Sequence, residues 1–334
     1  MELNFGRVEG LPPEEQQWLQ ELKYIYDYHR SANRKKRRYY NGKVTLNEVN
    51  LGIALPAGLG KLEIGCAWGA KTVDVLAGRS MFDGFVTENG TKSEDMDQIM
   101  KRNHLIAEYN KAVKEELKYG CAFAAVSGEE DDARVRFYSP HCAAASWNAH
   151  EGRIRYGFAF EDARRDESDV TWSPEHVNFY TDTDIWELDR IGGTWYATQN
   201  PHYFGEPLMV ALIWDATNDK PFGQSRLKEP VRRLIQGYVR TVANATIGLE
   251  FATSPQKYLL GVSDEQYDML IDNKFKQYVG SILYSTNNPE TGEKPNFGQL
   301  SQGNIEPHVQ MLRMLATQYS AATGLAVTDV GVIN

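Results

Sequence analysis

Apolar residues recur at helical spacing in three stretches of the first 120 residues. These stretches cover residues 13–38, 63–80 and 92–119. In the third stretch, Ser93 stands where a helix cap is needed and Gly120 stands where a helix would stop. The pattern therefore predicts three helices before residue 121.

The pattern changes between residues 121 and 214, where short apolar segments alternate with turn signals such as Gly192-Gly193. Such spacing is typical of strands and, after the preceding helices, predicts an α+β body. The expected strands are Cys121–Ser127, Val135–Ser139, Ala143–Ala149, Arg153–Glu161, Val170–Trp172, His176–Thr181, Ile185–Leu188, Thr194–Gln199 and Gly205–Trp214.

A long amphipathic helix is expected next. Because Pro230 fits best in a first turn, the regular helix should begin near Glu229, and the pattern continues to about Phe251. Its apolar stripe is predicted to be Leu227, Val231, Leu234, Tyr238, Val242, Ala245 and Leu249.

A second helical run covers residues 304–324, with Asn304 as a possible cap and Gly324 as its end. Glu306 and Arg313 are its only charged residues, so we expect burial on more than one side, most simply by a neighbouring subunit. The predicted stripe is Ile305, Val309, Leu312, Leu315, Tyr319 and Ala322.

Between the two long helices, the sequence predicts a small α/β insert. Lys257–Val262 and Ser281–Ser285 are expected as strands, Asp264–Val279 as a helix, and Phe297–Leu300 as a short third strand. One helix would lead away from the body and the other would return, with the insert at the tip between them. Such a projection suits a subunit of a ring-shaped assembly.

Composition limits the function classes. The 334 residues are 42% hydrophobic and carry a net charge of -9, without an apolar run long enough to span a membrane or the pattern of a signal peptide. Three widely spaced cysteines predict free thiols. The acidic balance argues against tight, static DNA binding but not against a channel through which DNA slides.

Candidate chemistry is sparse. Gly60-Lys61 lacks the remaining residues of a phosphate-binding loop, so that stretch is expected to be an ordinary loop. Neither catalytic residues nor a metal or cofactor site is predicted. Three groups are the candidates. His141, Cys142 and His150 could form a metal site or a Cys-His pair, and Asp182, Asp184, Glu187 and Asp189 could be hydrolase carboxylates. The basic run Arg34–Arg38 could contact nucleic acid or an acidic neighbour, or be a solvated helix end.

Several segments, taken in order, resemble the portal proteins of tailed bacteriophages. The likeness extends over nearly the whole chain from about Leu11, as a distributed pattern without one sharp signature. The segments that carry it are Tyr39–Gly42, Leu76–Phe85, Asn103–Gly120, Pro221–Arg226, Phe251–Gly261, Asn304–Pro307 and Ala322–Leu325.

The resemblance implies a portal-like α+β fold in which a helix-and-sheet wing body carries two long stem helices around a small α/β clip. Val327, Thr328, Asp329 and Asn334 would belong to a tunnel loop facing the DNA channel, and the crown that follows it in the family is expected to be absent through truncation. A frayed tail is the alternative for these residues. The implied division is 1–222 wing, 223–251 first stem helix, 252–303 clip, 304–324 second stem helix and 325–334 start of the tunnel loop.

The resemblance also implies a function without covalent chemistry. Subunits would form a ring, typically a dodecamer, at one capsid vertex of the virion after assembly in the host cytoplasm, and double-stranded DNA would pass through it. Terminase, head–tail connector, capsid and scaffolding proteins would be partners, without a membrane. The stem-packing residues would be Leu234, Tyr238, Val242, Leu312, Leu315 and Tyr319. A phage-encoded hydrolase with an acidic α+β cleft and a structural module that forms no ring are the alternatives.

Overall fold

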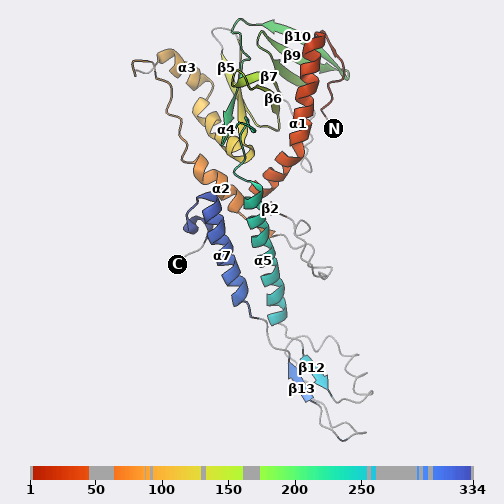
Figure 1. The fold of residues 1–334 in the computed structure, drawn as a ribbon, viewed down its shortest axis with the longest axis vertical. Helices are drawn as coiled ribbons and strands as arrows, with labels where there is room; N and C mark the ends of the chain where they lie inside the picture. Colours follow the sequence, from red (N-terminus) through yellow and green to blue (C-terminus); the bar gives the residue numbers. More distant parts are fainter. Residues whose placement is uncertain are drawn as a thin grey trace.

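A computed structural model describes residues 3–44, 64–86, 88–90, 93–128, 133–160, 174–253, 257–260, 292, 296–299 and 304–331. An α+β body carries a two-helix arm, and a small two-stranded sheet lies at the end of the arm away from the body (Figure 1). The loop expected around Gly60-Lys61, the strand at 170–172, most of the insert and Asn334 lie outside the described residues.

The body begins with a short strand and a long helix that covers a sheet. β1 (Val8–Glu9) pairs in parallel with β10, and α1 spans Pro13–Tyr40, close to the predicted 13–38. Leu19, Leu22 and Tyr26 of α1 are buried against the aromatic residues of the sheet, as their helical spacing predicted.

The six-stranded sheet has the order β1-β10-β9-β8-β7-β6 and is antiparallel except for β1. Its predicted strands were confirmed to within a few residues. They are β6 (Ala143–Asn148), β7 (Arg153–Phe160), β8 (His176–Tyr180), β9 (Asp184–Ile191) and β10 (Thr194–Pro201).

A second, three-stranded sheet has the order β11-β4-β5. It comprises β4 (Cys121–Ser127), β5 (Arg134–Tyr138) and β11 (Met209–Ile213), shorter than the predicted 205–214. Buried residues from both sheets, among them Phe123, Tyr180 and Met209, form the core between them.

The prediction of one helix over 92–119 was wrong. The region forms two helices, α3 (Glu94–Arg102) and α4 (Leu105–Tyr119). His104 between them has a φ of 50°. The Asn103 side chain donates to the carbonyls of Ile99 and Ala133 and accepts from the amide of Val135. These bonds tie the break to the start of β5, a tertiary contact that helical spacing cannot reveal.

The helix predicted over 63–80 is shorter than expected. α2 spans Trp68–Ala77, because Ile64–Gly65 (β3) pairs with Lys43–Val44 (β2) as a small ribbon. The Ser93 side chain accepts a hydrogen bond from the backbone amide of Met96, and Gly120 ends α4 with a φ of 112°, as predicted.

The chain enters the arm through a tight connection after β11. Gly223 has a φ of 73°, and a Cβ at this position would lie 2.2 Å from the carbonyl oxygen of Trp214. The amide of Gln224 donates to that same oxygen. Only glycine fits here, which gives a physical reason for Gly223 in the Pro221-Phe222-Gly223 segment.

The arm consists of α5 (Glu229–Thr253) and α7 (Glu306–Thr323), which run in opposite directions (Figure 1). Both helices confirm the predicted ranges, and Gly324 ends α7 with a φ of 70°. The Asn304 side chain accepts a hydrogen bond from the backbone amide of Glu306. At the far end, β12 (Lys257–Leu260) pairs with β13 (Asn296–Gln299), near the predicted strands; the insert's predicted helix lies outside the described residues.

Candidate functional site: the arm and its junction with the body

The buried row of α5 differs from the predicted stripe. Near the body, α5 packs against α7 and also against α2 and β3, so two of its sides are covered. Leu234, Tyr238 and Val242 are half-buried, and Leu249 is 45% exposed. The fully covered row is Leu227, Val231, Ile235, Val239 and Ala243.

Gly237 of α5 faces Leu315 of α7 in the seam between the arm helices. A Cβ at Gly237 would lie 3.2 Å from a methyl carbon of Leu315, so the missing side chain lets the two helices approach. Leu315 and Tyr319 are buried, whereas Leu312 is half-buried. On α7, Val309 is 36% exposed and Ala322 is exposed, so the predicted α7 stripe is fully buried only at Leu315 and Tyr319.

The outward side of α7 exposes two methionines among polar residues such as Gln310 and Gln318. Met311 is 40% exposed and Met314 is 47% exposed. Arg313 is the one charged residue between them. Exposed long apolar side chains that lie together mark a surface that another molecule covers. The sequence-based expectation of burial on a second side therefore concerns this face, which the described residues leave exposed.

The junction between arm and body is built around Trp68 of α2. Its ring lies 4.5 Å from the ring centre of Tyr238 and 4.7 Å from that of Tyr319. The hydroxyls of Tyr319 and Thr72 lie 2.5 Å apart, and each lies 2.9 Å from the carbonyl oxygen of Trp68. Burial raises the pKa of Tyr319, so this phenol stays neutral.

Arg226 joins three elements at the same junction. Its guanidinium donates to the carbonyl oxygens of Thr72 in α2 and Thr323 in the last turn of α7, and it lies over the ring of Trp214. A cation at a helix C-terminus is stabilised by the free carbonyls there. Arg226 therefore fixes the body-proximal ends of both arm helices relative to α2.

The segment after α7 is folded onto the junction. Residues Val327–Val330 form a 3-10 turn, η4. The side chains of Val330 in this turn and of Leu325 before it are buried. The Ser320 hydroxyl donates to the carbonyl of Leu325, and Trp68 Nε1 donates to the carbonyl of Val330 at 3.2 Å.

The sequence-predicted channel residues lie in this turn. Val327 and Asp329 are half-buried and Thr328 is exposed, while Asn334 is outside the described residues. Up to Gly331, the segment lies against α2 and does not project from the arm.

Sequence reasoning missed Trp68, Thr72, Arg226 and Ser320. Arg226 stood inside a segment singled out for its resemblance, and a tryptophan at the start of a small-residue helix was a signal for Trp68. Their partners are too distant in sequence for spacing to connect them.

The basic run at the end of α1 is partly internal. Lys36 Nζ donates to the carbonyl of Tyr119 at 2.8 Å, and burial lowers the pKa of Lys36 to about 8. Lys35 and Arg38 are exposed. The run is therefore neither a fully solvated end nor a continuous basic patch.

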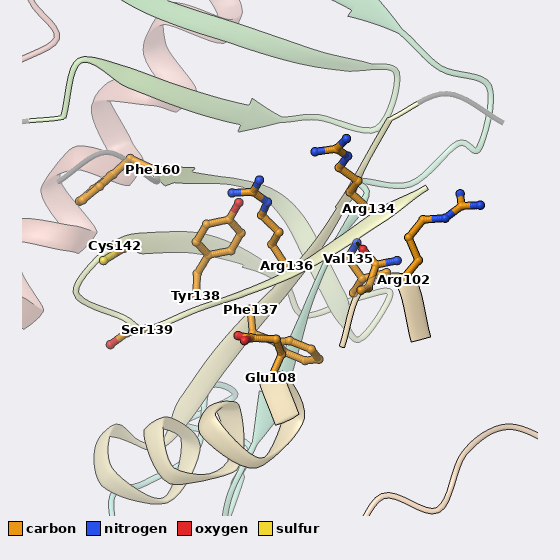
Figure 2. A pocket seen from close by; sticks show the side chains of 11 residues that line it. Arg102, Glu108, Arg134, Val135, Arg136, Phe137, Tyr138, Ser139, Cys142 and Phe160 are labelled. Carbon is orange, nitrogen blue, oxygen red and sulfur yellow. Dashed lines mark hydrogen bonds between the residues drawn. The ribbon is translucent and has the colours of Figure 1, made fainter. Parts of the chain in front are cut away.

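A cleft of about 710 Å³ lies beside β5 (Figure 2). Arg102, Arg134 and Arg136 line it, with Glu108 as the acid among its described lining residues, and Glu108 pairs with Lys111 at 2.6 Å. Burial raises the pKa of the Cys142 thiol to about 12, so it is not a nucleophile near neutral pH. These described residues lack an activated nucleophile with a base.

The other candidate groups are not brought together. Asp184 points to the buried side of β9 and accepts from Thr183 and Gln199, whereas Asp189 pairs with His176 at 2.7 Å. His141 and Cys142 precede β6, and His150 follows it in the hairpin turn. Within the described residues, no group of three or more His, Cys, Asp or Glu side chains is arranged to hold a metal ion.

Within the part of the chain that the structure describes, no helix is both long and apolar enough to cross a membrane.

Comparison with known proteins gives one family match. The family model described as phage portal protein, SPP1 Gp6-like, matches residues 19–213, more than half of the chain. No curated protein sequence matches significantly.

Solved structures with a similar arrangement come from gene transfer agent (GTA) particles. A chain in the virion of the native particle aligns with a TM-score of 0.45 at 12% identity, over 80% of this chain and 67% of that one. Chains in the neck of the empty particle, computed with C6 symmetry, and of the native particle, computed with C12 symmetry, align with TM-scores of 0.47 and 0.45 at the same identity and coverage.

Proposed function

The chain belongs to the SPP1 Gp6-like family of phage portal proteins, and on that basis we propose that it forms the ring at one capsid vertex through which double-stranded DNA enters and leaves. The family match over residues 19–213 carries the proposal. In this proposal the protein acts structurally, and its partners are terminase, head–tail connector, capsid and scaffolding proteins.

We assign the parts of the molecule accordingly. The body, residues 1–222, is the wing, the arm is the stem, residues 252–303 are the clip that meets terminase and connector, and residues 325–334 begin the tunnel loop. The exposed side of α7 that carries Met311 and Met314 supports this assignment, because a ring would cover it with the neighbouring arm.

The proposed mechanism is steric and electrostatic. The chain has 45 acidic against 36 basic residues, so a ring of such chains repels a phosphate backbone overall and holds DNA weakly. Weak attraction suits a channel through which DNA slides. No arrangement in the described residues favours the hydrolase alternative, since the carboxylates Asp184 and Asp189 already have structural partners.

Native mass spectrometry and electron microscopy of the purified chain test the proposal. We expect closed rings, with twelve subunits as the expected number. A protein that remains monomeric across the accessible concentration range, without rings in micrographs, would refute it.

A further inference from the structure

One side of the body carries an exposed aromatic and basic stripe. Tyr24 and Tyr28 of α1 are each 70% exposed, and their rings stack with centroids 6.4 Å apart. Lys35 follows on the same helical face, two turns further on, and is also exposed. We define the α1 flank as the exposed residues Tyr24, Tyr28, Ser31, Lys35 and Arg38 on this face; Gln17, Gln20 and Glu21 extend the face toward the start of the helix.

The opposite side of the body carries an exposed apolar and acidic surface. Met81 is 80%, Val86 is 69% and Ile106 is 53% exposed. We call this surface the α3 flank; it comprises Met81, Asp83, Phe85, Val86, Glu88, Glu94, Asp95 and Ile106, all of them exposed.

The α3 flank is one surface because internal contacts hold its parts together. The ring of Phe82 packs against Tyr109 of α4 with centroids 5.2 Å apart, and Gly84 lies against Met100 of α3. Ile106 stands one helical turn before Tyr109. The connecting segment 81–86 therefore lies on α3 and α4, with Met81 and Val86 facing outward.

The two flanks lie on opposite sides of the body, with the arm extending below them (Figure 1). A closed ring is built from head-to-tail contacts, which need two different, complementary surfaces on opposite sides of each subunit. Exposed tyrosines and apolar residues are typical of buried interface centres. Lys35 and Arg38 on one flank oppose in charge Asp83, Glu88, Glu94 and Asp95 on the other.

We propose that in the ring the α1 flank of each subunit packs on the α3 flank of the next copy, with Tyr24 and Tyr28 against Met81 and Val86. This inference rests on the proposed ring and names the surfaces that close it. The acids of α3 lie in its first turn, while Lys101 and Arg102 lie in its last turn, so the charge pattern also sets the direction in which α1 crosses α3.

Cysteine cross-linking with a flexible bis-maleimide tests the pairing. The double variant Tyr28→Cys/Met81→Cys should give a ladder of covalent dimers, trimers and higher species on a denaturing gel. Each single variant should give none, because its cysteine meets a different surface. The wild-type chain is the background control, since Cys66 and Cys121 are buried and Cys142 is half-buried. Both replaced side chains are exposed, and Tyr24→Cys/Val86→Cys provides a second pair.

Native mass spectrometry of the same samples separates the possible failures. Rings without a ladder from either pair overturn this interface and leave the ring proposal standing. Dimers from Tyr28→Cys alone overturn it in favour of a two-fold self-contact. Absence of rings and ladders refutes the ring and the interface together. Charge reversal adds a second readout: Lys35→Glu should weaken ring formation at low salt at least fivefold, and an added Asp95→Lys should restore it, whereas loss without rescue counts against the pairing.

Discussion

Trp68 in the first turn of α2 donates its indole N–H to the carbonyl oxygen of Val330, 262 positions later in the chain. The same tryptophan packs between Tyr238 and Tyr319, one from each arm helix. The segment after α7 and the root of the arm are therefore held by one side chain. In a portal ring, the position of this segment and the angle of the arm would be coupled through it.

Trp68→Phe tests this coupling. The substitution keeps an aromatic ring between Tyr238 and Tyr319 but removes the donor to Val330, which should cost roughly 1 kcal/mol. Amide hydrogen exchange in peptides covering residues 325–331 should then rise roughly fivefold, measured by mass spectrometry. Trp18→Phe is the matched control, because Trp18 stacks on Tyr156 away from the junction. Unchanged exchange at 325–331 in Trp68→Phe would mean that the bond does not hold the segment.

Much of the fold followed from local pattern. The ends of α5 and α7 were set by Pro230, Pro307 and Gly324, whose backbone preferences act within a few residues. The strands of the larger sheet followed from turn signals and short apolar segments. Such features need no knowledge of what packs against them, and the sequence predicted them within a few positions.

The rest depends on contacts between distant residues. The break between α3 and α4 exists because Asn103 bonds to the start of β5, and the buried row of α5 shifts to Ile235 and Val239 because a second side is covered near the body. The junction brings Trp68, Arg226 and Val330 together from three parts of the chain. Helical spacing reports that a face is apolar, but not which neighbour covers it.

Charge on the two sides of α7 should separate folding from assembly. Leu315 is 5% exposed in the seam, so Leu315→Glu would bury an unpaired carboxylate and should destabilise the fold by several kcal/mol. Met314 is 47% exposed, so Met314→Glu should leave the melting temperature of the subunit nearly unchanged but reduce ring formation. Thermal unfolding and native mass spectrometry of both variants give the two readouts. Normal ring yield from Met314→Glu would show that this face of α7 is not covered in the assembly.

Glycine-to-alanine substitutions in α5 should reveal how tightly the seam is packed. Gly248 has no atom within 4 Å of an added Cβ, so Gly248→Ala should gain roughly 0.5–1 kcal/mol from helix propensity. At Gly237, the added Cβ would lie 3.2 Å from Leu315, and the contact should cancel part or all of that gain. Urea unfolding of the two variants measures the difference. Equal stabilisation at both positions would contradict a close α5–α7 approach at Gly237.

His141 should make the protein sensitive to mild acid. It is 6% exposed, its Nε2 has no hydrogen-bond partner among the described residues, and its ring packs edge-on against Tyr119. Burial, with help from Arg37, lowers the pKa of His141 from 6.5 to about 4. The unfolded chain therefore binds a proton at a higher pH than the folded chain does. Stability is complete above about pH 6.5 and is lost as the pH falls toward 4, by up to about 3 kcal/mol.

The variant His141→Phe isolates this contribution, because it keeps the aromatic contact with Tyr119 and removes the titrating group. The free energy of unfolding in urea should depend less on pH between about 4 and 6.5 in the variant than in the wild type. Nearby Glu115, Lys118 and Arg34 remain in both proteins, so their effects cancel in the comparison. His150→Phe, at an exposed hairpin turn, is the matched control and should keep the wild-type slope. An unchanged slope in His141→Phe would assign the acid sensitivity to other groups.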